Sequence, residues 1–279
     1  MTTAIQSWCF RDRKKEPTFD IYRALDLTEE MGFQGIEIIS GDLASEDEQG
    51  LQAAKDYATK RGVTVNAVFV FTNFARIDKP EVVREDIAKI NRWLRICGSA
   101  EVPFLSMLSG VAREGLPREE QRKSIRKAFG QCVPVAEQNR VTMVIENFGG
   151  LIFWAQEMVD FIQEVGSQHL RINIDTEYWA GQEFFTTHPD PAGVERLYEN
   201  AAIAAPFAAT SHIKIKGLTD NDRLLGYGDD LSRLIWIYHL AGFQGPLTFE
   251  SIVDGDILAP LPRARELVDG AIAKVQRKE

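Results

Sequence analysis

Residues 141–176 read VTMVIENFGGLIFWAQEMVDFIQEVGSQHLRINIDT and contain one complete strand–helix–strand pattern. The runs at 141–147 and 170–176 are short, apolar and rich in β-branched residues, as is typical of buried strands. Between them, 155–166 has the spacing of an amphipathic helix and ends in Gly166, a common residue at a helix C-terminal cap. The segment therefore predicts one βαβ unit with parallel strands.

The same alternation continues on both sides of this segment. The expected strands are residues 4–10, 35–40, 63–71, 102–108, 141–147, 170–176, 210–216 and 246–251, and their starts lie 28 to 40 residues apart. Further amphipathic segments lie at 18–32, 80–98 and 231–243. Eight βα units favour a closed barrel over an open sheet, because closure leaves no edge strand. We therefore expect an α/β protein with the (β/α)8 TIM barrel fold.

Length and composition fit a single soluble domain. The chain has 279 residues, an ordinary length for a barrel of roughly 250 residues, and no low-complexity linker divides it. Its formal net charge of −9 repels a phosphate backbone and so disfavours nucleic acid as a partner. No stretch approaches the roughly 20 apolar residues of a membrane span, and the N-terminus lacks a signal-peptide pattern. Three scattered cysteines indicate a reducing compartment. We expect one domain over 1–279, located in the cytoplasm.

Four side chains with metal-ligand chemistry lie near the ends of the last four expected strands. They are Glu146, Asp175, His212 and Glu250, which are 29, 37 and 38 residues apart along the chain, close to one βα unit each time. In this fold the carboxyl ends of the strands form the active site. The four side chains are therefore expected to converge on one rim.

Three carboxylates and one imidazole form a hard, oxygen-rich set that suits Mn²⁺, Mg²⁺ or Co²⁺. Without a cation the carboxylates would repel one another. Each acid taken alone could instead pair with an interior lysine, and Lys214 and Lys216 are available for that. The set as a whole predicts one divalent metal ion, for which we expect Mn²⁺ first and Mg²⁺ or Co²⁺ as alternatives. Among the other histidines, His188 follows the sixth strand and is a candidate substrate contact.

Several segments resemble a known group of barrels. VIENFGG (144–150), INIDTEYW (172–179), SHIKIKG (211–217) and GYGDDLSRLIWIYHLAGFQGPLTFES (226–251) resemble, in this order, the last four strand-end segments of the xylose isomerase-like barrel superfamily, the sugar phosphate isomerase/epimerase group. GFQGIEI (32–38) resembles the second strand of that group. The resemblance implies that Glu146, Asp175, His212 and Glu250 are metal ligands. It further implies that Glu146 and Glu250 are an acid/base pair which moves a proton next to a carbonyl through an enediolate.

The chain also departs from the group at several positions. Tyr178 stands where keto-sugar epimerases commonly have a histidine, and Phe148 stands where related isomerases often have one. The epimerase arginine beyond the strand-seven histidine is missing, and Lys214 or Lys216 is its expected replacement. The expected substrate-binding residues are Trp8, Asn147, Tyr178, Trp179, His188, Lys214 and Lys216.

The expected rim is rich in aromatic residues. They are Trp8, Phe10, Phe69, Phe71, Phe74, Phe148, Phe153, Trp154, Tyr178 and Trp179. We hypothesise that about half belong to the core and that the others stack against a bulky or glycosylated substrate, since aromatic faces pack on sugar C–H patches and planar substituents.

The resemblance implies a divalent-metal-dependent sugar isomerase or epimerase. The alternative is a metal-dependent lyase or dehydratase that performs β-elimination on a keto-sugar, an inosose or an oxidised glycoside, including C-glycoside cleavage, because the superfamily contains both. Endonucleases of the superfamily need a three-metal cluster with more histidines than the four present here. A carbohydrate-binding module without activity is the alternative from another class. The expected partner is a small carbohydrate or glycoside, and the resemblance allows a homo-oligomer.

Overall fold

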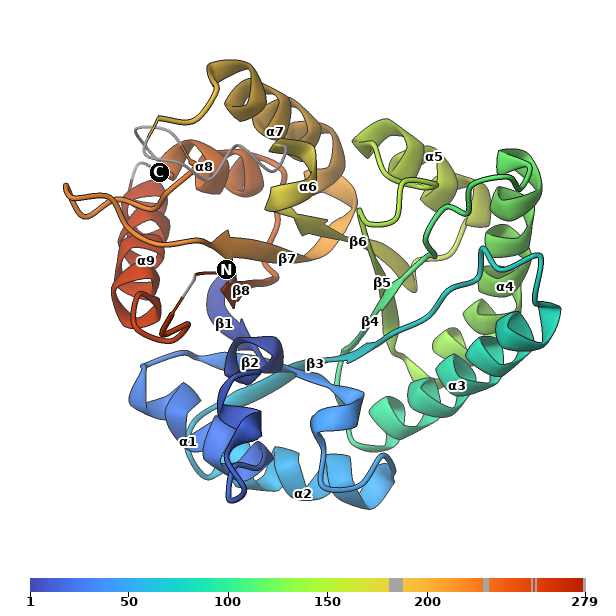
Figure 1. The fold of residues 1–279 in the computed structure, drawn as a ribbon, viewed down its shortest axis with the longest axis horizontal. Helices are drawn as coiled ribbons and strands as arrows, with labels where there is room; N and C mark the ends of the chain where they lie inside the picture. Colours follow the sequence, from blue (N-terminus) through green and yellow to red (C-terminus); the bar gives the residue numbers. More distant parts are fainter. Residues whose placement is uncertain (181–187, 228–230, 252, 254, 278–279) are drawn as a thin grey trace.

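The computed structural model describes residues 1–180, 188–227, 231–251, 253 and 255–277, and its strands form one closed parallel barrel (Figure 1). The strands are β1 (Thr2–Gln6), β2 (Gly35–Ile39), β3 (Thr64–Val70), β4 (Phe104–Leu108), β5 (Thr142–Glu146), β6 (Leu170–Asp175), β7 (Ala208–Ile215) and β8 (Pro246–Ser251). They follow one another around the barrel in sequence order, and β1 pairs with β8 to close it, with Ile5 opposite Phe249. The expected α/β class and TIM barrel fold are confirmed.

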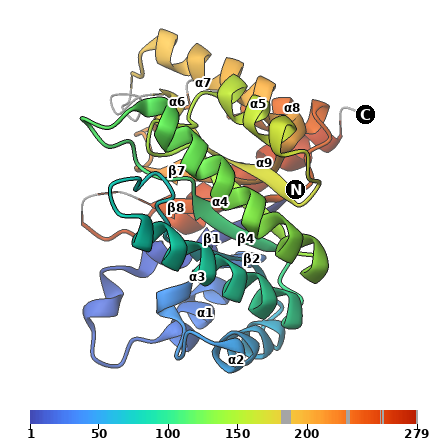
Figure 2. The same ribbon diagram turned by 90° about the vertical axis from the view of Figure 1, so that its right-hand side faces the viewer.

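Helices alternate with the strands and cover the outside of the barrel. They are α1 (Ile21–Glu30), α2 (Glu48–Thr59), α3 (Pro80–Ser99), α4 (Arg118–Asn139), α5 (Ala155–Val165), α6 (Thr176–Ala180), α7 (Pro191–Ala204), α8 (Ser232–Leu240) and α9 (Leu261–Gln276). Figure 2 shows α3 and α4 side by side across the barrel, and these two helices contact each other. None of the helices in the described part of the chain combines the length and apolar character needed to cross a bilayer.

Local sequence explains where several helices begin and end. The side chain of Asp20 accepts a hydrogen bond from Arg23 N at 2.9 Å, and Asp47 accepts one from Gly50 N at 2.9 Å. Each aspartate satisfies an amide that the first turn leaves without a partner. At the other end of α5, Gly166 adopts φ 72° and terminates the helix as its sequence position predicted.

The first strand is shorter than expected. We predicted a strand over 4–10, but β1 ends at Gln6 and Ser7–Phe10 form a 3-10 helix. The apolar pattern continues past the strand because Cys9 and Phe10 pack into the interior after the turn, with exposed fractions of 1% and 0%. Buried residues are apolar whether they belong to a strand or to a turn. The sequence pattern therefore could not show that the strand ends at Gln6.

Candidate metal centre

The four predicted ligands lie together inside the carboxyl end of the barrel. Glu146 and Asp175 are the last residues of β5 and β6, while His212 and Glu250 lie on β7 and β8. Asp175 is opposite His212 in the β6–β7 register, so the imidazole stands beside the end of β6. All four side chains are buried. The barrel topology, rather than proximity in sequence, brings them to one place.

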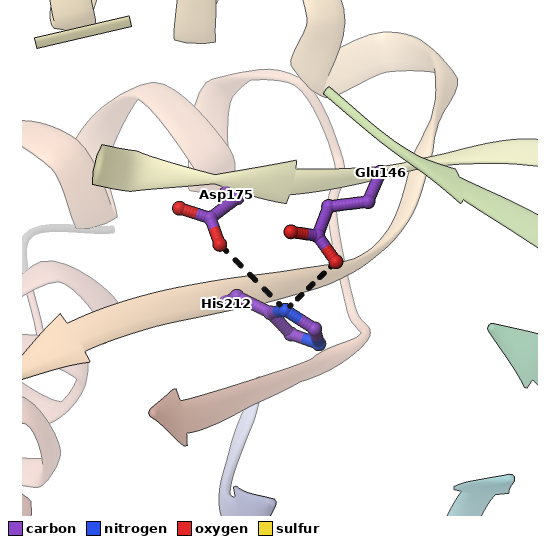
Figure 3. A group of neighbouring side chains, drawn as sticks. All are labelled: Glu146, Asp175 and His212. Carbon is purple, nitrogen blue, oxygen red and sulfur yellow. Dashed lines mark ion pairs between the residues drawn. The ribbon is translucent and has the colours of Figure 1, made fainter. Parts of the chain in front are cut away.

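The imidazole of His212 is the centre of the group (Figure 3). Its Nδ1 lies 3.5 Å from Glu146 Oε2 and 3.9 Å from Asp175 Oδ2. Ligand atoms of these three residues all lie within 4.8 Å of one another. Glu250 approaches the same nitrogen from β8, with Oε1 at 3.4 Å.

A cation suits this arrangement chemically. Buried polar atoms normally have hydrogen-bond partners, yet His212 Nδ1 has none among the described residues. The atoms that face it are carboxylate oxygens, which accept hydrogen bonds when ionised. A divalent ion between a ring nitrogen and carboxylate oxygens would satisfy both kinds of group. The donor set therefore fits the metal that the sequence predicted.

Asp175 is held in place by its neighbours. Its backbone amide donates to Asn147 Oδ1 at 2.6 Å, and Asn147 Nδ2 donates to its carbonyl oxygen at 2.9 Å. The amide of Glu177 donates to Asp175 Oδ1 at 2.8 Å. Asp175 Oδ2 faces the cluster, and Lys214 Nζ is 3.0 Å from it. The side chain of Asn147, expected to bind substrate, is thus fully buried and joined to the main chain of Asp175.

Two lysines lie near the acidic side chains, one on β7 and one just after the end of that strand. The ammonium of Lys214, only 5% exposed, contacts Glu250 Oε2. It also lies 5.5 Å from the ring centroid of Tyr178, in cation–π range. Lys216 is farther out, with Nζ 3.0 Å from Glu177 Oε1. Of the two expected replacements for the epimerase arginine, Lys214 is therefore the one inside the cluster.

Burial and charge shift the protonation of the group in different directions. Burial raises the pKa of Glu146 well above its ordinary value, against the opposing influence of His212. Burial would likewise raise the pKa of Glu250, but Lys214 and His212 outweigh it and lower that pKa. Burial disfavours the imidazolium of His212, yet the nearby Glu37 and Glu250 carboxylates raise its pKa to about 10. Without a cation, the centre therefore holds protons that a metal would have to displace.

Sequence reasoning missed one member of the cluster. Glu37, in the middle of β2, is 2% exposed, and its Oε2 lies 2.6 Å from His212 Nε2. Gln6 of β1 donates from Nε2 to the same carboxylate at 3.2 Å. A lone acid in the apolar run GIEII was the available signal, since a buried carboxylate requires a partner.

The remaining residues that are expected to contact substrate differ in how far their side chains are exposed to solvent. Trp179 is fully buried and its indole N–H donates to Phe153 O at 2.8 Å, so it belongs to the core. His188 is exposed before α7. Tyr178 is half-buried and its ring packs edge-on against Phe148, with centroids 5.1 Å apart.

The aromatic rim contains a buried and an open part. Phe10, Phe69, Phe74 and Trp179 are buried, Phe148, Phe153 and Tyr178 are half-buried, and Trp8, Phe71 and Trp154 are exposed. The Phe69 ring lies 6.4 Å from the imidazole of His212 and 5.0 Å from Phe71, which is 53% exposed. An aromatic pair therefore leads from the cluster toward solvent at the end of β3.

Comparison with known proteins agrees with the barrel fold. A family model described as "Xylose isomerase-like TIM barrel" matches residues 25–273, whereas no curated protein matches the chain. Among solved structures, an L-ribulose 3-epimerase is similar at 18% identity and a TM-score of 0.76, over 99% of this chain and 96% of that one. The D-psicose 3-epimerase from Clostridium cellulolyticum H10, solved with D-tagatose, has 15% identity and a TM-score of 0.72, over 99% of both chains. The 3-keto-D-glucoside 4-epimerase from E. coli has 15% identity and a TM-score of 0.71, over 98% of this chain and 99% of that one. At these identities the solved structures establish the fold.

Proposed function

Because this chain belongs to the xylose isomerase-like TIM barrel family, we propose that it is a divalent-metal-dependent sugar isomerase or epimerase that transfers a proton at a carbon next to a carbonyl. The observation that carries the proposal is the pair of buried glutamates that both approach one histidine nitrogen. Glu146 Oε2 and Glu250 Oε1 lie 3.5 Å and 3.4 Å from His212 Nδ1. The sugar epimerases among the similar structures support the same reaction class.

In this proposal Glu146, Asp175, His212 and Glu250 hold the metal. The bound ion, with Mn²⁺ the first candidate, would polarise the substrate carbonyl and acidify the neighbouring C–H bond. The chain supplies the proton transfers, for which a carboxylate must lie within reach of the substrate carbon. Glu146 and Glu250 come from β5 and β8, strands that are not adjacent in the barrel. One glutamate removes the proton and the other returns it.

Lys214 has a supporting part in the proposed reaction. Its ammonium contacts Glu250 Oε2 and lies 3.0 Å from Asp175 Oδ2. It therefore holds both carboxylates in place and adds positive charge where the substrate oxygens would become negative. Such electrostatic stabilisation of developing charge usually contributes more to the rate enhancement than any other single effect.

The exposed aromatic residues indicate the part of the substrate that does not react. Trp8, Phe71 and Trp154 follow β1, β3 and β5 and so lie on the side where the carboxyl ends of the strands open. Exposed aromatic side chains at a binding site commonly contact planar or apolar ligand groups. We propose that the substrate is a keto-sugar with a bulky or aromatic substituent rather than a small free sugar.

The same residues support a second candidate function. A lyase or dehydratase would begin with the same proton abstraction and then expel a β leaving group from a keto-sugar, an inosose or an oxidised glycoside. The aromatic rim favours this candidate, since a large leaving group needs an apolar surface to bind. C-glycoside cleavage is included in this alternative.

One measurement separates these functions. Mg²⁺-loaded protein is incubated in D₂O with keto-sugars and oxidised aryl glycosides, and the products are followed by proton NMR, with Glu250→Gln as the control. Deuterium in a recovered or epimerised sugar supports the isomerase, and release of a leaving group supports the lyase. Binding without exchange in any sugar would show a carbohydrate-binding module and overturn the proposal.

A further inference from the structure

The carboxylate of Glu37 fixes one nitrogen of the central imidazole. Glu37 Oε2 and His212 Nε2 are 2.6 Å apart, although the two residues are 175 positions apart in sequence. Both side chains are buried, with exposed fractions of 2% and 0%. An ionised carboxylate can only accept a hydrogen bond, so the proton lies on Nε2 and is donated to Glu37.

The orientation of the ring follows from this contact. With Nε2 directed at Glu37 on β2, Nδ1 is directed at Glu146, Asp175 and Glu250 on β5, β6 and β8. A neutral imidazole that carries its proton on Nε2 has its lone pair on Nδ1. That lone pair is the one a cation among the three carboxylates would use.

Glu37 is itself held by a neighbour. Gln6 lies opposite Glu37 in the β1–β2 register and donates to Glu37 Oε2 at 3.2 Å. Gln6 also helps to lower the pKa of Glu250. The same buried amide therefore acts on the carboxylate behind the histidine and on a candidate ligand of β8.

We propose that Glu37 is a positioning residue of the metal centre, which holds His212 in the orientation and tautomer that present Nδ1 to the ion. The inference rests on the proposed metal dependence but concerns a residue outside the four proposed ligands, whose contact is with the ring of His212. Carboxylates behind metal-ligating histidines raise the basicity of the ligand, and their loss typically weakens metal binding by about 10- to 100-fold.

The first test compares Mn²⁺ affinity in folded variants. Glu37→Gln keeps the size and one acceptor oxygen, Glu37→Leu removes the hydrogen bond, and Thr3→Val is the control. Thr3 is a buried β1 residue whose Oγ1 donates to Asp269 at 3.1 Å, away from the cluster. Free Mn²⁺ is measured by electron paramagnetic resonance below each melting temperature. We expect about 10- to 100-fold weaker binding in Glu37→Leu, a smaller loss in Glu37→Gln and none in Thr3→Val.

A second readout follows the ring proton itself. In Mg²⁺-loaded protein labelled with ¹⁵N-histidine, His212 Nε2–H should give a downfield resonance that is absent in His212→Ala. Glu37→Gln should move that resonance upfield. If Glu37→Leu does not fold, Glu37→Gln alone decides both readouts.

Two outcomes would overturn the inference. One is a Glu37→Gln protein with wild-type Mn²⁺ affinity and an unmoved ring-proton resonance. The other is a Glu37→Leu protein that loses thermal stability as Thr3→Val does but binds Mn²⁺ normally. Neither readout needs a substrate. If the Glu37 variants bind Mn²⁺ more weakly but no sugar exchanges a proton, the proposed reaction is wrong and this inference holds. If sugars exchange protons but the Glu37 variants bind Mn²⁺ as the wild type does, this inference is wrong and the proposed reaction holds.

Discussion

Lys214 donates a hydrogen bond from Nζ to Oε2 of Glu250 inside the carboxyl end of the barrel. The contact gives the two candidate acid/base glutamates different surroundings, because Glu250 has a buried ammonium against it. The pKa of Glu250 lies below its ordinary value in spite of burial, while burial raises that of Glu146. The contact with Lys214 thus gives two residues of the same type pKa values that are shifted in opposite directions.

Replacement of either glutamate by glutamine should abolish turnover. Loss of a positioned acid or base typically lowers the rate by about 10²- to 10⁴-fold, so we expect at least that loss in kcat for Glu146→Gln and Glu250→Gln. Glu250→Gln should also weaken metal binding and lower the melting temperature more than Glu146→Gln, because it leaves Lys214 without its carboxylate. Steady-state kinetics and calorimetry measure these effects. Full activity in either variant removes that residue from the mechanism.

Loss of the buried ammonium should destabilise the protein when metal is removed. Breaking a buried ion pair by removing one partner costs about 3–5 kcal/mol, so Lys214→Met should lower the free energy of unfolding in EDTA by about that amount. Mn²⁺ should restore more stability in this variant than in the wild type, because it becomes the main cation of the cluster. The control is Lys216→Met, whose side chain is 22% exposed. Equal unfolding curves for the two variants in EDTA would contradict the expectation.

Metal binding should release protons and strengthen as pH rises. The pKa of His212 is raised to about 10 by Glu37 and Glu250, so at pH 7 the metal-free imidazole is protonated. A metal at Nδ1 must displace that proton. Affinity for Mn²⁺ should therefore increase from pH 7 toward pH 10 and fall at lower pH. Titration calorimetry in buffers of different ionisation enthalpy counts the protons, and heats that do not depend on the buffer would refute the prediction. His212→Ala should release fewer protons and show lower metal occupancy by elemental analysis.

Removal of an exposed aromatic side chain from the rim should weaken the binding of large substrates only. An aromatic contact contributes about 0.5–1.5 kcal/mol beyond area burial, which corresponds to a change of roughly 2- to 12-fold in binding. Phe71→Ala should raise KM for an aryl-substituted keto-sugar by this factor and leave kcat unchanged. Leu240→Ala is the control, since Leu240 is 69% exposed and ends α8, which precedes β8 in the chain. An equal rise in KM for a small free keto-sugar would count against the proposed substituent.

The fold and the four candidate ligands could be predicted because both depend on a repeat. Each βα unit places the end of its strand on the same rim, so polar residues one unit apart are brought together whatever the loops do. The spacing of Glu146, Asp175, His212 and Glu250 therefore predicted the cluster that the barrel forms. The roles of these residues as ligands and acid/base groups stay predictions.

The residues around the cluster could not be predicted in the same way. Glu37 lies within an apolar strand, and its partner on β7 depends on which side chains point into the barrel. Asn147 and Trp179 are predicted substrate contacts, and both are fully buried and hydrogen-bonded to the main chain, an arrangement that the spacing did not predict. The direction of a side chain after the end of a strand depends on the loop geometry, which the repeat does not encode.

The contact between β2 and β7 also has a consequence for folding. The first four strands carry Glu37 and none of the four candidate ligands, whereas the last four carry all of the ligands but not Glu37. A chain cut between β4 and β5 would thus separate the orienting carboxylate from the imidazole that it orients. A bound ion stabilises only the state that can bind it. Metal would therefore favour assembly of the two half-barrels. Separation of the halves would remove Glu37 from His212 and so accelerate dissociation of the ion.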